Sequence, residues 1–136
     1  MSFVVDASVA CKWVFDEEGS PAAVEILKTH RALLAPDLLI AEVVNAAWRK
    51  TATGDVSMEQ ATAAIQALPG LVTELLPAAR LAELALSIAV ALDHPAYGCL
   101  YLALAEERNS EVVTFDRRFA ARAAGSPWAR RVTVLG

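Results

Sequence analysis

The chain has 136 residues, which suits one domain spanning residues 1–136 with a buried hydrophobic core. Its net charge of −4 excludes an overall positive field for nucleic acid, and its hydrophobic fraction of 56% favours packed helices. No apolar run is long enough for a membrane span and no secretory leader is recognisable, so we expect a cytoplasmic protein. Cys11 and Cys99 lack a metal-binding spacing, and we expect both thiols to be free and buried.

The order of the predicted elements indicates an α/β protein, because short β-branched runs alternate with longer helical patterns. Ser57 and Gln60 have the spacing of a capping box, and Pro69 and Gly70 end the helix that follows. This alternation predicts a three-layer α/β/α sandwich with a central parallel sheet. In chain order we expect a strand at 3–5, helices at 9–15 and 20–28, a strand at 33–35, helices at 37–50 and 58–68, an ambiguous strand at 71–76, helices at 78–92 and 95–107, a strand at 112–114, a helix ending near 125 and a strand at 132–135.

Two aspartates follow predicted strands. Asp6 comes directly after the first strand, and Asp116 comes just after the strand at 112–114. Ligands of open parallel sheets bind outside the carboxyl ends of the strands, so this position favours a functional site. Each aspartate alone is also explained as the N-cap of the next helix. Two of them at equivalent strand ends favour a shared site.

Glu42 is a third acidic candidate, inside the predicted helix 37–50. Glu42, Asn45 and Arg49 are three and four residues apart, so they share one helical face. A solvated polar stripe is the alternative interpretation. The shortness of the stripe in an apolar segment favours a polar site.

Three carboxylates around one point repel one another unless a cation lies between them. Their oxygen atoms suit Mg²⁺ or Mn²⁺, whereas the cysteines and the two histidines offer no zinc-binding set. A divalent ion in such a site positions a phosphodiester and activates water. Metal-dependent phosphodiester hydrolysis is therefore the leading reaction class, with Lys12, Arg49, Arg117 and Arg118 as candidate phosphate contacts or simply solvated charges.

Four motifs resemble those of the PIN domain family, and together they span nearly the whole chain in the family's order. The length resembles that of the VapC toxins of bacterial toxin–antitoxin pairs. The motifs are VVDAS at 4–8, PDLL at 36–39 followed by EVVNA at 42–46, HPAYGCLYLALA at 94–105, and VTFDRRF at 113–119.

This resemblance implies a Mg²⁺- or Mn²⁺-dependent endoribonuclease that cleaves RNA. It also implies a homodimer that a cognate VapB-type antitoxin holds inactive. The catalytic and metal-binding acids that the resemblance implies are Asp6, Glu42 and Asp116, and the neighbouring polar residues that it implies as support are Ser8, Asn45 and Thr114.

One position departs from the family pattern. The third motif normally carries an aspartate where this chain has Gly98. An acid would be favoured in the first turns of that helix, whereas a glycine inside a helix costs about 1 kcal/mol relative to alanine. Asp93 lies five residues upstream, before a proline, and we do not expect it to aim at the same point. We therefore expect weaker metal binding and reduced or absent cleavage.

Two alternative functions compete with this interpretation, and the second is disfavoured by the sequence. The first is a non-catalytic PIN-like module that binds the antitoxin or RNA, which Gly98 favours. The second is a receiver-like phosphoacceptor domain, which would need paired acids after the first strand and a lysine after a late strand. Neither of those features is present.

Overall fold

A computed structural model describes residues 2–136 and contains a five-stranded sheet with the order β3-β2-β1-β4-β5. All four strand pairings are parallel. The predicted α/β/α sandwich is confirmed, and the ambiguous segment at 71–76 contributes a short edge strand. The strands are β1 (Ser2–Val5), β2 (Ala32–Pro36), β3 (Glu74–Leu76), β4 (Glu111–Thr114) and β5 (Val132–Val134).

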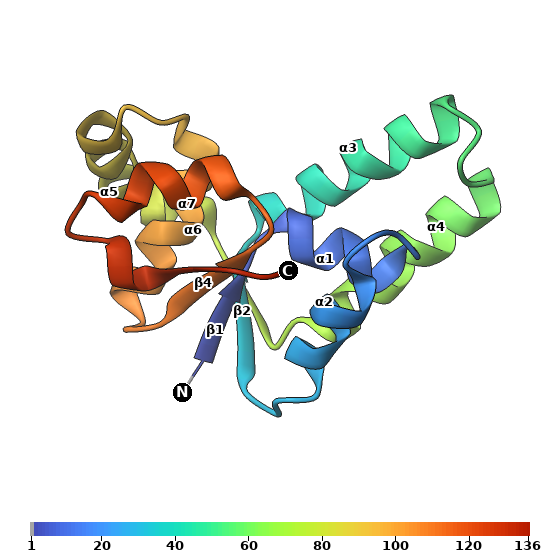
Figure 1. Ribbon diagram of the computed structural model, residues 1–136. Coiled ribbons are helices and arrows are strands. Elements are labelled where there is room, and N and C mark those ends of the chain that lie inside the picture. The colour runs from blue at the N-terminus through green and yellow to red at the C-terminus, as the bar shows by residue number, and fades with distance from the viewer. Residues whose placement is uncertain (1) are drawn as a thin grey trace.

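Helices cover both faces of the sheet. Figure 1 shows α1 to α4 on one side of the strands and α5 to α7 on the other. In α4 the predicted capping box of Ser57 and Gln60 is present. The helices are α1 (Ala7–Val14), α2 (Ser20–Leu27), α3 (Leu38–Ala52), α4 (Met58–Ala67), α5 (Ala78–Leu92), α6 (Ala96–Glu107) and α7 (Arg117–Ala124), with short 3₁₀ turns at Leu68–Leu71 and Ala129–Arg131.

The centre of the sheet is apolar because β1 and β4 are enclosed by helices on both faces. Val4, Val5, Val112 and Val113 are essentially inaccessible to solvent. Val5 pairs with Val113, so the residues that follow the two strands leave the sheet at the same edge. The chain proceeds from β1 toward β3 on one side and from β4 to β5 on the other. The crevice beyond β1 and β4 is therefore the switch point where such sheets bind ligands.

One detail differs from the local sequence pattern, in which an aspartate directly before a helix acts as its N-cap. Asp37 precedes α3 but its side chain does not cap that helix; it accepts a hydrogen bond from the Ala78 amide at 3.0 Å instead. Both cysteines are free and buried, as expected. Over residues 2–136, no single helix is long and apolar enough to span a membrane; α5 and α6 together reach that length but meet at a bend of 116°.

Candidate metal-dependent active site

Asp6 lies where β1 ends, and its carboxylate is held by three donors. The hydroxyl groups of Ser8 and Thr114 each donate to one of its oxygens at 2.5 Å, and the Val9 amide donates at 3.3 Å. The last of these bonds makes Asp6 the N-cap of α1, which is the alternative role considered for it. These contacts fix the orientation of the carboxylate and leave it facing the crevice.

Thr114 joins the ends of the two central strands. It is completely buried, and its hydroxyl accepts the Asp116 amide at 2.9 Å while donating to Asp6. Ser8 makes a similar link, since its hydroxyl accepts the Phe115 amide at 2.9 Å and donates to Asp6. One hydroxyl from each side thus ties Asp6 to the backbone that follows β4.

Burial raises the pKa of Asp6 to about 6. The hydrogen bonds from Ser8, Thr114 and Val9 lower this pKa but do not outweigh the burial, and the nearby Glu42 carboxylate raises it further. Without a cation, this carboxyl group therefore takes up a proton more readily than an exposed aspartate.

Glu42 projects from α3, and one of its oxygens accepts a hydrogen bond from the Tyr101 hydroxyl at 2.5 Å. Tyr101 is on α6 and only 2% exposed. Burial, the charge of Glu42 and this hydrogen bond all raise the pKa of Tyr101, so the phenol stays protonated as a donor. The contact connects the helical layers on opposite faces of the sheet and leaves the second Glu42 oxygen without a protein donor among residues 2–136.

Asp116 lies at the start of α7. One of its carboxylate oxygens accepts the amides of Arg118 at 3.0 Å and Phe119 at 3.1 Å, so it is the N-cap of this helix. Its side chain is exposed at the surface of the crevice. The other carboxylate oxygen makes no hydrogen bond with the described part of the chain.

All three acids line one hollow of about 820 Å³, which we call the acid hollow. Its wall also contains Asp93, an exposed residue with a left-handed backbone at φ 50°. Four carboxylates from four separate segments thus line the acid hollow: Asp6, Glu42, Asp93 and Asp116.

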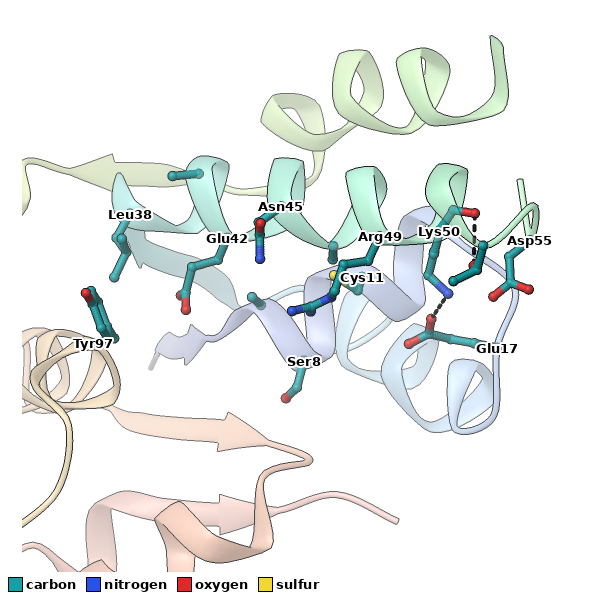
Figure 2. Close-up of a pocket in the computed structure, with 14 residues that line it drawn as sticks. Ser8, Cys11, Glu17, Leu38, Glu42, Asn45, Arg49, Lys50, Asp55 and Tyr97 are labelled. Carbon is teal, nitrogen blue, oxygen red and sulfur yellow. Dashed lines mark hydrogen bonds and ion pairs between the residues drawn. The ribbon is translucent and has the colours of Figure 1, made fainter. Parts of the chain in front are cut away.

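A second hollow of about 710 Å³ runs along α3, and we call it the α3 hollow. Figure 2 shows Glu42, Asn45 and Arg49 projecting from one face of α3 toward α1. Of the supporting residues that the resemblance implies, Ser8 and Thr114 touch Asp6, whereas Asn45 lies only in this second hollow. The two hollows share Ala7, Ser8, Glu42 and Tyr97.

The donor set fits a hard divalent cation. Among residues 2–136, no three His, Cys, Asp or Glu side chains are close enough to enclose a metal by themselves. Mg²⁺ does not require such an enclosure, because it keeps several waters and uses one or two carboxylates together with substrate phosphates. The raised pKa of Asp6 points the same way, because burial is its main cause and a bound cation would stabilise the buried carboxylate. Asp6, Glu42 and Asp116 are the candidates from which one or two such carboxylate ligands would come.

Gly98 lies in the wall of the acid hollow with ordinary helical backbone, since its φ is not positive. A Cβ atom added there would stand 3.3 Å from His94 Nε2 and 3.3 Å from the Phe119 ring. The two rings pack against each other with their centroids 5.3 Å apart. The place of a side chain at position 98 is thus partly filled by His94.

Several residues of the site have no clear signal in the sequence. Tyr101 lies within an apolar helical run, and its partner Glu42 is 59 residues away. Arg122 lines the acid hollow together with Arg118, one turn before it on α7.

Two of the candidate phosphate contacts, Lys12 and Arg117, line neither hollow. Lys12 pairs with Glu17 at 3.1 Å, and Arg117 donates to the Gly136 carbonyl at 2.9 Å.

Comparison with known proteins gives matches over most of the chain. The sequence profile of the PIN domain matches residues 3–125. Ribonuclease VapC1 from two strains of Mycobacterium tuberculosis, CDC 1551 / Oshkosh and ATCC 25618 / H37Rv, is 34% identical over 125 residues. This alignment covers 91% of the present chain and 92% of each relative.

Two solved structures share the fold. The crystal structure of PAE2754 from Pyrobaculum aerophilum superposes with a TM-score of 0.68 at 23% identity, covering 93% of this chain and 82% of that one. The sarcin-ricin loop cleaving toxin VapC20 of Mycobacterium tuberculosis superposes with a TM-score of 0.70 at 17% identity, covering 88% and 93%.

Proposed function

The chain belongs to the PIN-domain family, as a VapC-type member, and on this premise we propose that it is a metal-dependent endoribonuclease toxin. The observation that carries the proposal is the meeting of Asp6, Glu42 and Asp116 around the acid hollow. The curated mycobacterial relatives are named as ribonucleases, and one of the structural neighbours is named as a toxin that cleaves the sarcin-ricin loop. The proposed substrate is the phosphodiester backbone of RNA.

The roles proposed for the acids follow from how each is held. Asp6 is fixed by Ser8 and Thr114, and Glu42 is fixed through one oxygen by Tyr101, so each keeps its orientation. With Asp116 they would bind Mg²⁺ or Mn²⁺. When bound, the ion supplies positive charge against the phosphodiester and favours ionisation of the attacking water. Loss of the Asp6 proton accompanies this binding, because the cation opposes the burial that raises its pKa.

The proposal is tested by measuring RNA cleavage and Mn²⁺ binding on the same preparations. Asp6→Asn and Glu42→Gln should each abolish Mn²⁺-dependent cleavage and weaken Mn²⁺ binding measured by calorimetry. Glu59→Gln removes an exposed acid on α4 outside both hollows and should leave both properties unchanged. Cleavage that persists in EDTA, or that survives both site substitutions, would refute the proposal.

Further parts of the proposal concern partners. As for a VapC-type toxin, we propose a homodimer in the cytoplasm that a VapB-type antitoxin neutralises. Surface hydrophobic groups offer contact area for such partners, since several large apolar side chains are between 45% and 75% exposed. They are Val44, Trp48, Met58, Leu86, Val90 and Tyr97. Light scattering of the purified chain, alone and with the product of the adjacent reading frame, tests both associations.

Gly98 favours a second candidate function, a non-catalytic PIN-like module that binds the antitoxin or RNA. The acid hollow has no carboxylate at this position, and His94 stands beside it. Calorimetry separates the candidates before any cleavage assay. The ribonuclease should bind Mn²⁺ or Mg²⁺ in a manner that depends on Asp6, whereas a binding module that has lost its metal should give no such heat.

A further inference from the structure

The acid hollow and the α3 hollow adjoin each other. They meet at Ser8, Glu42 and Tyr97, which line both. From this junction one arm follows α3 to Arg49, and the other passes between α6 and α7 to Arg118 and Arg122. The candidate acids therefore lie near the middle of a path with two open arms rather than at the bottom of a closed pocket.

Both arms contain arginines without partners. Among residues 2–136, the guanidinium groups of Arg49, Arg118 and Arg122 make no ion pair and no hydrogen bond, although carboxylates line the same hollows. Most arginines elsewhere are engaged by protein groups: Arg80 with Glu107, Arg108 with Glu74, Arg117 with Gly136 and Arg131 with Asn109. In a chain of net charge −4, free guanidinium groups on both sides of one site point to an anionic ligand that reaches both arms.

Tyr97 stands at the junction with its ring 66% exposed. Tyr101, one turn later on α6, is buried and its hydroxyl is occupied by Glu42. Figure 2 shows Tyr97 beside Leu38 and Glu42 at the end of the α3 hollow. An exposed aromatic face next to the candidate acids suits stacking with an unpaired base.

We infer that one unpaired RNA strand crosses both hollows, with a base stacked on Tyr97 and its phosphates bound by Arg49 on one side and by Arg118 and Arg122 on the other. This inference rests on the proposed ribonuclease function and adds how the substrate is held. A double helix cannot use the tyrosine in this way, because its bases are already stacked. The three unpaired arginines favour a polyanion over a peptide as the ligand of the two hollows.

The first test measures the stacking. Binding of a short labelled single-stranded RNA to the full chain is followed by fluorescence anisotropy, in EDTA and in parallel in Ca²⁺. Tyr97→Ala should weaken binding about tenfold, whereas Tyr97→Phe keeps the ring and should change it less than about twofold. Trp48→Ala is the matched control, because Trp48 is 62% exposed but lines neither hollow.

The second test counts phosphate contacts through the salt dependence of the dissociation constant. Each contact to a single strand contributes about 0.7 to the slope of log Kd against log salt, so Arg49→Ala and Arg118→Ala should each lower the slope by about that amount. Arg130→Ala removes an exposed arginine outside both hollows and should leave the slope unchanged.

The outcomes separate this inference from the proposed function. If the wild-type chain binds and cleaves RNA while the Tyr97 and arginine variants bind it equally well, the path is wrong and the ribonuclease stands. Equal affinity for a duplex of the same sequence also overturns the path. If these variants lose affinity only for the antitoxin, the two hollows bind that protein rather than RNA, and the inference is wrong. Absence of RNA binding in both EDTA and Ca²⁺ refutes the inference and the proposed function together.

Discussion

Asp6 combines two properties that oppose each other in the absence of a cation. Its carboxylate is held by Ser8 and Thr114, yet burial raises its pKa to about 6 from 3.8. Such a residue weakens the metal-free fold at neutral pH and favours any state in which positive charge is bound nearby. The polar residues around it therefore orient the group without making it stable as an isolated charge.

The free energy of unfolding should reveal this property of Asp6. Below pH 3.8 the carboxyl is protonated in both states; between pH 3.8 and about 6 the unfolded chain loses the proton while the folded chain keeps it, so stability falls as pH rises. The full loss, reached above pH 6, is about 3 kcal/mol. In EDTA, urea titrations should show Asp6→Asn gaining this amount relative to wild type between pH 4 and 7. A difference between the two proteins that stays constant from pH 4 to 7 would contradict it.

Gly98 is the residue at which an added acid should strengthen the site. Because a Cβ there stands 3.3 Å from His94 Nε2 and the Phe119 ring, Gly98→Asp needs a small movement of His94. We expect about tenfold tighter Mn²⁺ binding, or about 1.4 kcal/mol, and faster RNA cleavage. The gain in Mn²⁺ affinity should be larger when His94→Ala is added, because the smaller side chain leaves room for the aspartate.

Gly70→Asp provides the matched control for this gain, since it adds an acid where no atom lies within 4 Å. Calorimetry with Mn²⁺ on the four proteins, including the double variant, decides the matter. If neither position-98 variant binds Mn²⁺ more tightly than the wild type, an acid at position 98 does not contribute to metal binding in the acid hollow.

At the scale of elements, the ends of β1 and β4 are joined by side-chain hydroxyl groups. Thr114 is the central link. Its fully buried hydroxyl donates a hydrogen bond to Asp6 and accepts one from the Asp116 amide. The register of the two strands brings these groups together, since Val5 pairs with Val113. The sheet and the helix that Asp116 caps are therefore positioned by one shared network.

Thr114→Val keeps the shape of the side chain but removes the hydrogen bonds of its hydroxyl to Asp6 and from the Asp116 amide, together with a longer contact to the Ser8 hydroxyl at 3.4 Å. We expect a loss of about 2–4 kcal/mol in the free energy of unfolding, since the buried amide and carboxylate lose a partner each. Thr133→Val on β5 is the control, because Thr133 is exposed and its hydroxyl bonds only the Glu111 side chain. A loss no larger than that of Thr133→Val, in denaturant titrations at one pH, would rule out the network as a structural link.

The sequence predicts some of these elements better than others for physical reasons. Asp6 and Asp116 follow short apolar strands, a pattern that depends only on neighbouring residues, and Glu42 belongs to a visible helical stripe. Asp37 has the sequence of an N-cap, but its carboxylate bonds a helix that begins 41 residues later, which no local pattern records. Tyr101 is equally hidden, because its apolar surroundings conceal a hydroxyl that bonds Glu42 across the molecule.

At the scale of the whole molecule, the candidate site lies between the two sets of helices. Glu42 comes from the layer of α1 to α4, whereas Asp93, Gly98 and Asp116 belong to the α5 to α7 half (Figure 1). A cation bound by Asp6, Glu42 and Asp116 would link both halves at the switch point of the sheet. Bound metal should consequently stabilise the entire fold, by about 2.7 kcal/mol when its concentration is one hundred times Kd.

Calorimetric titration of Mn²⁺ into the wild-type chain and into a variant with Asp6→Asn, Glu42→Gln and Asp116→Asn tests the central claim most directly. We predict saturable binding to the wild type, with release of protons below pH 6, and no binding at this site in the variant. Equal binding to both proteins, or no binding to the wild type, would contradict the assignment of these three carboxylates as a metal site.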